Sequence, residues 1–221
     1  MNISQAITNR KSTRAFLDKE VSQAQLTRIL EVAKYAPSGT NAQPWEVAVV
    51  RGKKKEQLTA ALLHAFRTDG LGEMDYNYYP VKWKEPFKKR RVTCGAQLYS
   101  ALKIERRDKE RRLEQWEANY RGFDAPALLF FFLDSIMEKG SFLDYGMFIQ
   151  SIMLAAIDEG LATCAQAALG QYPELIKKTL GYGEDHILIC GMAIGFEDTS
   201  APQNNYRTER EDVGVFTKFF E

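Results

Sequence analysis

The chain has 221 residues, and 45% of them are hydrophobic, which is enough for one sizeable buried core. Its formal net charge of +1 excludes a global electrostatic attraction to nucleic acid or to an anionic membrane surface. Three cysteines and two histidines are scattered along the chain, which excludes a disulfide framework and a histidine-rich metal site. The first residues lack the apolar block of a secretory signal, and no repeat or linker interrupts the sequence. We therefore expect one soluble domain, residues 1–221, without a metal ion and located in the cytoplasm.

Local signals mark the first elements in the chain. Ser22 and Gln25 have the spacing of a capping box, and apolar residues at helical spacing follow them. That helix should end before Pro37, because the residue that precedes a proline is kept out of the helical region. Residues 45–50, WEVAVV, predict a strand. A further helix is indicated by Leu58, Leu62 and Phe66.

Residues 71–86, LGEMDYNYYPVKWKEP, are rich in aromatic side chains and show no regular period. We expect a long irregular excursion, and such segments in compact domains are usually functional or mobile. It is either a lid that offers aromatic contacts to a substrate or a loop packed against the body. Helices around 92–105 and 108–120 are expected to follow.

Residues 82–112 contain twelve Lys or Arg against four acids. This excess of positive charge either attracts anionic substrates or belongs to a solvated helix face. The second interpretation is favoured for the later helix by two pairs in the stabilising i,i+4 order, Glu105–Lys109 and Asp108–Arg112.

The second half of the chain is the more apolar one. Residues 127–134, ALLFFFLD, predict a strand covered on both faces. Residues 142–159 are apolar nearly all round and predict a central or subunit-interface helix that ends at Gly160. The most apolar stretch, residues 142–157, is interrupted by Asp144 and Gln150 and is too short for a comfortable membrane span. A short helix from Pro173 and a buried strand, HILICGMAIGF, complete the pattern. Helices outnumber strands without regular βαβ alternation, which indicates an α+β fold with a sheet between helices.

Two motifs in the first half could bind a ligand. In RKSTR, the side chains of Arg10, Ser12 and Arg14 share one face if the segment is extended, and two guanidinium groups suit an anion. A solvated basic patch is the alternative. In APSGTNAQPW, residues 36–45, polar groups surround a glycine that permits close backbone approach, and Trp45 anchors the loop. An ordinary helix-to-strand connection is the alternative.

Two further motifs lie in the second half. The small side chains of GLATCAQAALG, residues 160–170, leave backbone amides free to face a ligand, although an edge strand would look the same. In NNYRTER, Arg207 and Arg210 supply two more cations for a bound anion. A surface charge cluster is the alternative.

In this order and spacing, the four motifs resemble the FMN-dependent nitroreductase family over essentially the whole chain. The stretches YYPVKWKEPFKKRR, GFDAPALLFFF and DYGMFIQSIMLAAIDEGLATCAQAAL are most similar to the nitrobenzoate-reductase type of member. The resemblance implies an α/β/α sandwich with a mixed, mainly antiparallel sheet, and a homodimer in which a C-terminal extension reaches the partner subunit. It also implies FMN at the subunit interface, NADH or NADPH as electron donor, and ping-pong reduction of nitroaromatic or quinone acceptors.

The resemblance also implies a set of cofactor contacts. The phosphate would be held by the N-terminal and C-terminal motifs through Arg10, Lys11, Ser12, Arg207 and Arg210. Arg14 would face the N1/O2 edge of the ring and stabilise the reduced flavin. The neighbouring subunit would hold the ring through Pro37, Ser38, Gly39 and Asn41. The backbone along the ring would be that of Gln166, Ala167 and Ala168.

The sequence departs from the family pattern in two places. Some family members have a Glu-Gly pair at Ala167 and Ala168, and the excursion lacks an Asn-x-x-Lys motif, so the family's contacts are not carried over to residues 70–90. The aromatic side chains of the excursion nevertheless make Tyr79 and Trp83 candidates for substrate contact.

Other functions remain open from the sequence. The same pocket could serve reductive dehalogenation, dehydrogenation or flavin breakdown, or it could store or sense flavin without turnover. A basic-helix nucleic-acid module is the least favoured alternative, since no recognisable binding module accompanies the charge.

Overall fold

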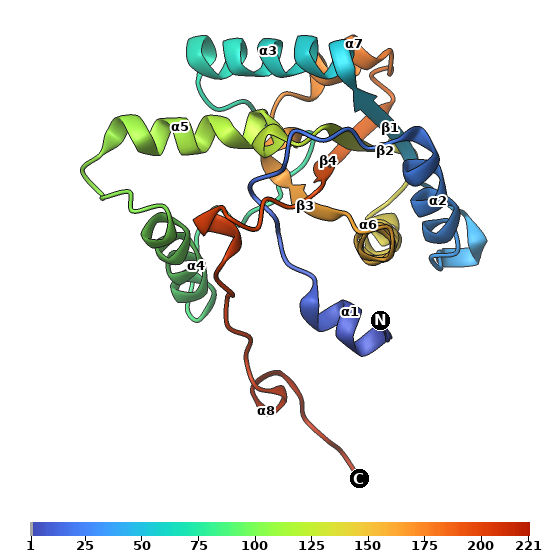
Figure 1. Ribbon diagram of the computed structural model, residues 1–221. Coiled ribbons are helices and arrows are strands. Elements are labelled where there is room, and N and C mark those ends of the chain that lie inside the picture. Colours follow the sequence, from blue (N-terminus) through green and yellow to red (C-terminus); the bar gives the residue numbers. More distant parts are fainter. Residues whose placement is uncertain (1) are drawn as a thin grey trace.

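A four-stranded antiparallel sheet, in the order β1-β2-β4-β3, lies between two layers of helices in the computed structural model, which describes residues 2–221 (Figure 1). The strands are β1 (Glu46–Arg51), β2 (Ala127–Asp134), β3 (Ala162–Gln166) and β4 (His186–Gly195). One parallel bridge, Ser12 to Thr163, continues the sheet beyond β3 and gives it its mixed character. The expected α+β sandwich is confirmed.

The central strand β2 explains why the core has two layers. Its first seven residues are buried, as its continuous apolar run predicts. Because side chains alternate along a strand, Leu129, Phe131 and Leu133 enter one core layer. The neighbouring side chains enter the other layer, and these are Leu128, Phe130 and Phe132.

One core layer is covered by α2 (Gln23–Ala33) and α6 (Gly140–Asp158). The capping box that begins α2 is confirmed, with both Ser22–Gln25 backbone-to-side-chain hydrogen bonds at 3.2 Å. The helix ends at Ala33, before Pro37, as predicted. Gly160 follows α6 with a φ of +71°, a left-handed conformation that favours glycine and ends the helix there.

Helix α6 combines a buried face with an exposed apolar one. Tyr145, Phe148 and Ile152 pack into the core, whereas Leu143 is 73% exposed. By length and composition alone, α6 could also cross a membrane, because the helix is longer than the apolar stretch of residues 142–157 that was expected to be too short. In the folded chain its buried face belongs to the core of the sandwich.

The opposite layer contains α3 (Gly52–Asp69), α5 (Lys109–Tyr120) and α7 (Pro173–Leu180). All three follow the predicted pattern, and Pro173 is the first residue of α7. A two-pronged ion pair joins α3 to α5, because Arg67 donates to both carboxylate oxygens of Glu117 at 2.7 and 2.8 Å.

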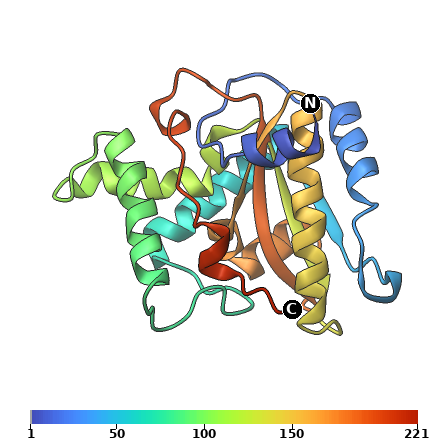
Figure 2. The same ribbon diagram turned by 90° about the horizontal axis from the view of Figure 1, so that it is seen from below.

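Helix α4 (Phe87–Ala101) begins five residues before the expected start at 92 and has no buried residue. It lies apart from the sheet at the edge of the molecule (green in Figure 2). The prediction of the i,i+4 pairs Glu105–Lys109 and Asp108–Arg112 is wrong, because α5 begins only at Lys109 and the acidic residue of each pair precedes the helix. Asp108 instead caps α5 by accepting the Arg111 backbone N–H at 3.1 Å, and Glu105 pairs with Arg107 at 2.8 Å.

Both chain ends lie on one side of the sandwich (Figure 1). The N-terminal helix α1 (Ile3–Asn9) leads into the RKSTR motif. The C-terminal segment runs away from the body and contains α8 (Val213–Phe216). Four short turns join the larger elements: η1 (Gly39–Asn41), η2 (Gly122–Asp124), η3 (Ala167–Gly170) and η4 (Pro202–Asn204).

Candidate functional site

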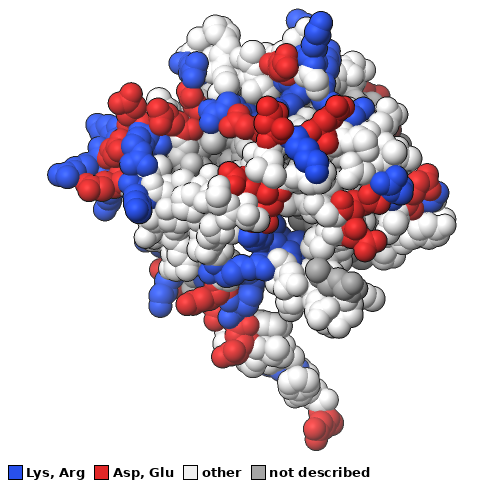
Figure 3. Space-filling model, in the orientation of Figure 1, with Lys and Arg blue, Asp and Glu red and all other residues white. Residues whose placement is uncertain are grey.

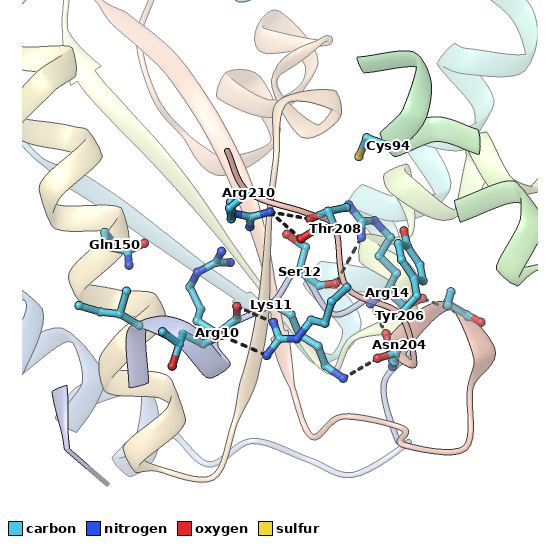
Figure 4. Close-up of a pocket in the computed structure, with 14 residues that line it drawn as sticks. Arg10, Lys11, Ser12, Arg14, Cys94, Gln150, Asn204, Tyr206, Thr208 and Arg210 are labelled. Atoms are coloured by element: carbon cyan, nitrogen blue, oxygen red, sulfur yellow. Dashed lines mark hydrogen bonds between the residues drawn. The ribbon is translucent and has the colours of Figure 1, made fainter. Parts of the chain in front are cut away.

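A cavity of about 560 Å³ lies where the N-terminal and C-terminal segments meet (Figure 4). Helix α4 contributes Cys94 to its wall, and α6 contributes Gln150. In the space-filling view, Lys and Arg side chains lie in a hollow above the C-terminal segment (Figure 3). Most of the lining comes from the two motifs at the ends of the chain, through Arg10, Lys11, Ser12, Arg14, Asn204, Tyr206, Arg207, Thr208 and Arg210.

The RKSTR motif is extended, as the alternating pattern requires. Thr13 donates its backbone N–H to Thr163 of β3 at 3.0 Å, and its side chain is fully buried. Arg10, Ser12 and Arg14 all line the cavity. The edge of the sheet therefore holds the backbone of the motif, and the predicted convergence of these three side chains is confirmed.

The electrostatics of the cavity favour an anion. All of its charged lining side chains are cations, namely Arg10, Lys11, Arg14, Arg207 and Arg210. Burial lowers the pKa of Arg10, and the nearby charges of Arg210 and Arg207 lower it further. Cations brought together in this way are stabilised by a multivalent anion, and guanidinium groups suit phosphate oxygens.

Two of these cations also form hydrogen bonds or ion pairs that hold the surrounding chain in place. Lys11 pairs with Glu197 at 2.5 Å and donates to the backbone oxygen of Asn204 at 2.5 Å. Arg207 donates to the backbone oxygens of Arg10, at 2.9 Å, and Asn9, at 2.5 Å, where α1 ends. Such bonds fix the two ends of the chain to each other, so the shape of the cavity depends on both motifs.

Asn204 is a site residue that the sequence reasoning missed. It is 2% exposed, accepts the Arg14 backbone N–H at 2.8 Å, and donates to the backbone oxygens of Ala15 and Asp198, each at 2.9 Å. It thereby holds Arg14 beside the C-terminal segment. Its position in NNYRTER, three residues before Arg207, was the available signal, and the same motif contains the second missed residue, Tyr206.

The loop of residues 37–43 lies outside this cavity. Asp144 of α6 accepts the Gly39 backbone N–H, and Ser38 Oγ accepts the Gln43 N–H at 2.9 Å. Trp45 stacks on Phe148 with ring centroids 4.6 Å apart, which confirms its anchoring role. Asp144 precedes the cavity residue Gln150 by six residues, roughly 9 Å along the helix. Pro37 and Asn41 are exposed, and a single chain does not bring them to the arginines.

The stretch around Gln166 adjoins the cavity without lining it. The edge-strand interpretation is correct for β3, which ends at Gln166, and Ala167 and Ala168 belong to the turn η3. Gln166 donates its side-chain amide to Asn119 of α5 at 2.9 Å. Its buried amide oxygen has no hydrogen-bond partner among residues 2–221. Because Thr163 of the same strand bridges to Ser12, this stretch is held next to the cation cluster.

Tyr79 and Trp83 lie in the excursion with ring centroids 5.7 Å apart. Neither lines the cavity. The guanidinium of Arg91 lies 5.1 Å from the Trp83 ring, which connects the excursion to α4 and so to the helix that carries Cys94.

Comparison with known proteins identifies the family of the chain. The nitroreductase family model matches residues 7–196. The chain is 37% identical to the nitrobenzene nitroreductase of Ectopseudomonas oleovorans over 219 residues, 98% of this chain and 96% of that protein. It is 33% identical to the 4-nitrobenzoate reductase of Pseudomonas putida over 213 residues, 96% of this chain and 93% of that protein.

The fold is also that of a solved relative. The FMN and NADPH-dependent nitroreductase NfnB of Sphigopyxis sp. strain HMH superposes with a TM-score of 0.96 at 37% identity, covering 100% of both chains. The match of the family model, the near-complete alignments and the fold agree with the resemblance carried by the four motifs. This protein belongs to the nitroreductase family.

Proposed function

We propose that this protein is an FMN-dependent oxidoreductase that uses NADPH or NADH to reduce nitroaromatic compounds, with quinones as further acceptors. The observation that carries the proposal is the cation-lined cavity, which lies within a chain of the nitroreductase family. Relatives at 33–37% identity over nearly their full length are named for nitrobenzene and 4-nitrobenzoate, and a solved relative is named for FMN and NADPH.

The cavity suits the phosphate of FMN. Its volume of about 560 Å³ lies within the usual range for small-ligand sites, and its charged lining is wholly cationic. Arg10 and Arg210 would bind the phosphate oxygens, with the Ser12 hydroxyl as a further donor. Lys11 and Arg207 would contribute charge while they hold the two ends of the chain together.

Bound FMN would supply the hydride-transfer chemistry, so the chain needs no nucleophile or metal of its own. The task of the protein is to position the ring and to stabilise charge where it develops. Arg14, whose backbone is fixed by Asn204, would lie at the N1/O2 edge of the ring and favour the reduced state. The backbone of residues 166–168 would lie along the ring, and the excursion with Tyr79 and Trp83 would contact the donor and the acceptor in turn.

We propose that the active form is a homodimer. The loop of Pro37, Ser38, Gly39 and Asn41 would reach the ring of the partner subunit, because within one chain it lies apart from the arginines. The outward apolar face of α6 and the exposed C-terminal side chains support this assembly, since large apolar patches of this kind are usually covered. The exposed C-terminal side chains are Val213, Val215, Phe216, Phe219 and Phe220.

We also place the enzyme in the cytoplasm, where its donor nucleotides are available and thiols stay reduced. Its cysteines, Cys94, Cys164 and Cys190, are free thiols in the structure. The proposed activity needs neither a membrane nor a nucleic acid as partner.

An absorbance experiment tests the proposal. The purified protein should show a bound flavin band that bleaches without oxygen when NADPH or NADH is added, and that returns when nitrobenzene follows. A bound band that neither nucleotide bleaches would identify a flavin-binding protein without turnover. A colourless protein that takes up no added FMN would contradict the proposal.

A further inference from the structure

The aromatic excursion is fixed to the body of the protein near its beginning, through Asp75 and Tyr76. The Asp75 carboxylate accepts hydrogen bonds from Lys177 Nζ at 3.1 and 3.2 Å and from the Leu188 backbone N–H at 2.8 Å. One residue later, the Tyr76 hydroxyl donates to the backbone oxygen of Ile189 at 2.7 Å. The excursion is therefore tied to α7 and to β4.

The ion pair is largely shielded from water. The Lys177 side chain is 11% exposed and the Asp75 side chain 19%, whereas many surface pairs of the chain are more open. Lys177 also donates to the backbone oxygen of His186 at 3.1 Å, so its ammonium is saturated. Shielded pairs with complete hydrogen bonding fix geometry, because either partner alone would leave an uncompensated charge.

The same segment contacts the turn η3. A Cβ atom added to Gly72 would lie 2.1 Å from the backbone oxygen of Gln171, and one added to Gly170 would lie 2.8 Å from Met74 Cε. The start of the excursion thus lies directly against Gly170 and Gln171, which follow the residues 166–168 that we place along the flavin ring.

Ring contacts connect this anchor to the rest of the excursion. Centroids are 6.2 Å apart for Tyr76 and Tyr78, and 4.7 Å apart for Tyr78 and Tyr79. The contact of Tyr79 with Trp83 continues the series, and Trp83 contacts Arg91 of α4. A shift at Asp75 would therefore move the two aromatic side chains that we expect to contact substrate.

We infer that Asp75 and Lys177 are positioning residues for the reductase reaction: their ion pair fixes the position of the aromatic excursion whose Tyr79 and Trp83 we expect to contact the acceptor. The inference rests on the proposed function. Removing the pair should loosen the excursion and weaken productive binding of the acceptor, while the phosphate site formed by the two ends of the chain stays intact.

The test compares Asp75→Asn and Lys177→Met with the wild-type holoenzyme and with Glu159→Gln, which removes an ion pair to Arg28 between α2 and α6. For nitrobenzene, kcat/KM per bound FMN should fall about tenfold in both excursion variants, chiefly through KM, as displaced contacts predict. Lys177→Arg, which keeps the charge, should recover most of the loss. Glu159→Gln should match the wild type.

A second readout does not depend on turnover. Trypsin should cleave the folded holoprotein after Lys82 about threefold faster in Asp75→Asn than in the wild type, because local opening exposes the backbone. Unchanged cleavage would overturn the inference, and so would an unchanged kcat/KM per bound FMN, including the case in which a variant merely loses FMN. Wild-type protein in which neither NADPH nor NADH drives turnover would instead refute the proposed function, and the cleavage assay would still report on the anchor.

Discussion

Asp144 accepts the backbone N–H of Gly39 with both of its carboxylate oxygens, at 3.2 and 3.3 Å. The loop that this contact holds contains Thr40, Asn41 and Gln43 with φ values of 52°, 60° and 50°. These φ values lie in the left-handed region, which costs a residue other than glycine about 1–3 kcal/mol. Such residues persist there only where the surroundings enforce the conformation. Asp144 therefore helps to hold the conformation of the loop that we propose reaches the partner subunit's flavin.

Asp144→Asn should weaken FMN binding to the dimer by about tenfold, because a hydrogen bond to a charged acceptor is worth about 1.5–3 kcal/mol and its loss relaxes the loop. Titration of the apoprotein with FMN, followed by flavin fluorescence, measures the change. Asp158→Asn, at the exposed end of the same helix, is the matched control. Equal FMN affinity in Asp144→Asn and the control would show that the loop does not need this carboxylate.

Arg10→Ala should weaken FMN binding by roughly 10–100-fold, the equivalent of one charge-assisted hydrogen bond to phosphate. Riboflavin, which lacks the phosphate, should bind the variant and the wild type alike. Isothermal titration at two salt concentrations measures both ligands, and the FMN affinity of the variant should depend less on salt. A parallel loss of riboflavin affinity would place Arg10 somewhere other than at the phosphate.

Arg14→Ala should retain FMN but lower its two-electron reduction potential by about 30 mV or more, which corresponds to about 1.4 kcal/mol of lost stabilisation of the reduced state. Arg14→Lys, which keeps a charge without the planar fork, should lie between the variant and the wild type. Spectroelectrochemical titration gives all three potentials. A potential in Arg14→Ala equal to that of the wild type would refute the assigned role.

The ion pair of Arg67 and Glu117 should make stability depend on pH. The hydrogen bond from Arg67 lowers the pKa of Glu117, so this stabilisation is fully present above the unfolded-state pKa of a glutamate, about 4.3, and is lost as the pH falls through the lower folded-state pKa. Glu117→Gln should cost about 1–2 kcal/mol at pH 7 and progressively less towards pH 3. Urea unfolding at several pH values measures this difference, and a cost that stays constant between pH 7 and pH 3 would contradict the assignment.

Removal of residues 213–221 should weaken dimerisation by on the order of tenfold or more, because the segment carries large exposed apolar side chains whose burial stabilises an interface. Sedimentation equilibrium compares the truncated and full-length chains with FMN bound. A full-length protein that stays monomeric at micromolar concentration would exclude a site shared between subunits.

Local sequence signals were sufficient for most of the fold. The capping box of Ser22 and Gln25 predicts the start of α2, and Pro173 predicts the start of α7. The continuous apolar run of β2 predicts that this strand is buried on both faces. The start of α4 was missed because its first turns carry lysines and arginines without an apolar period. The expected i,i+4 pairs failed for a related reason, since they presuppose a helix start that the chain places at Lys109.

The site was predictable where its chemistry follows the local pattern. Alternation in RKSTR brings Arg10, Ser12 and Arg14 to one cavity, as an extended backbone requires. The ion pair of Lys11 with Glu197 and the bonds of Asn204 join segments almost 190 residues apart, and no local period encodes them. The loop that contains Gly39 cannot be placed against the cavity from one chain, because its proposed partner surface belongs to a second copy.

The central claim is that the arginines at the two chain ends form a phosphate-binding socket for FMN. Equilibrium binding of FMN and of riboflavin to the wild-type apoprotein tests it most directly. We predict one FMN per chain, bound about 100-fold more tightly than riboflavin, since two charge-assisted contacts to the phosphate are lost in riboflavin. Equal affinity for the two flavins, or no binding of either, would contradict the account.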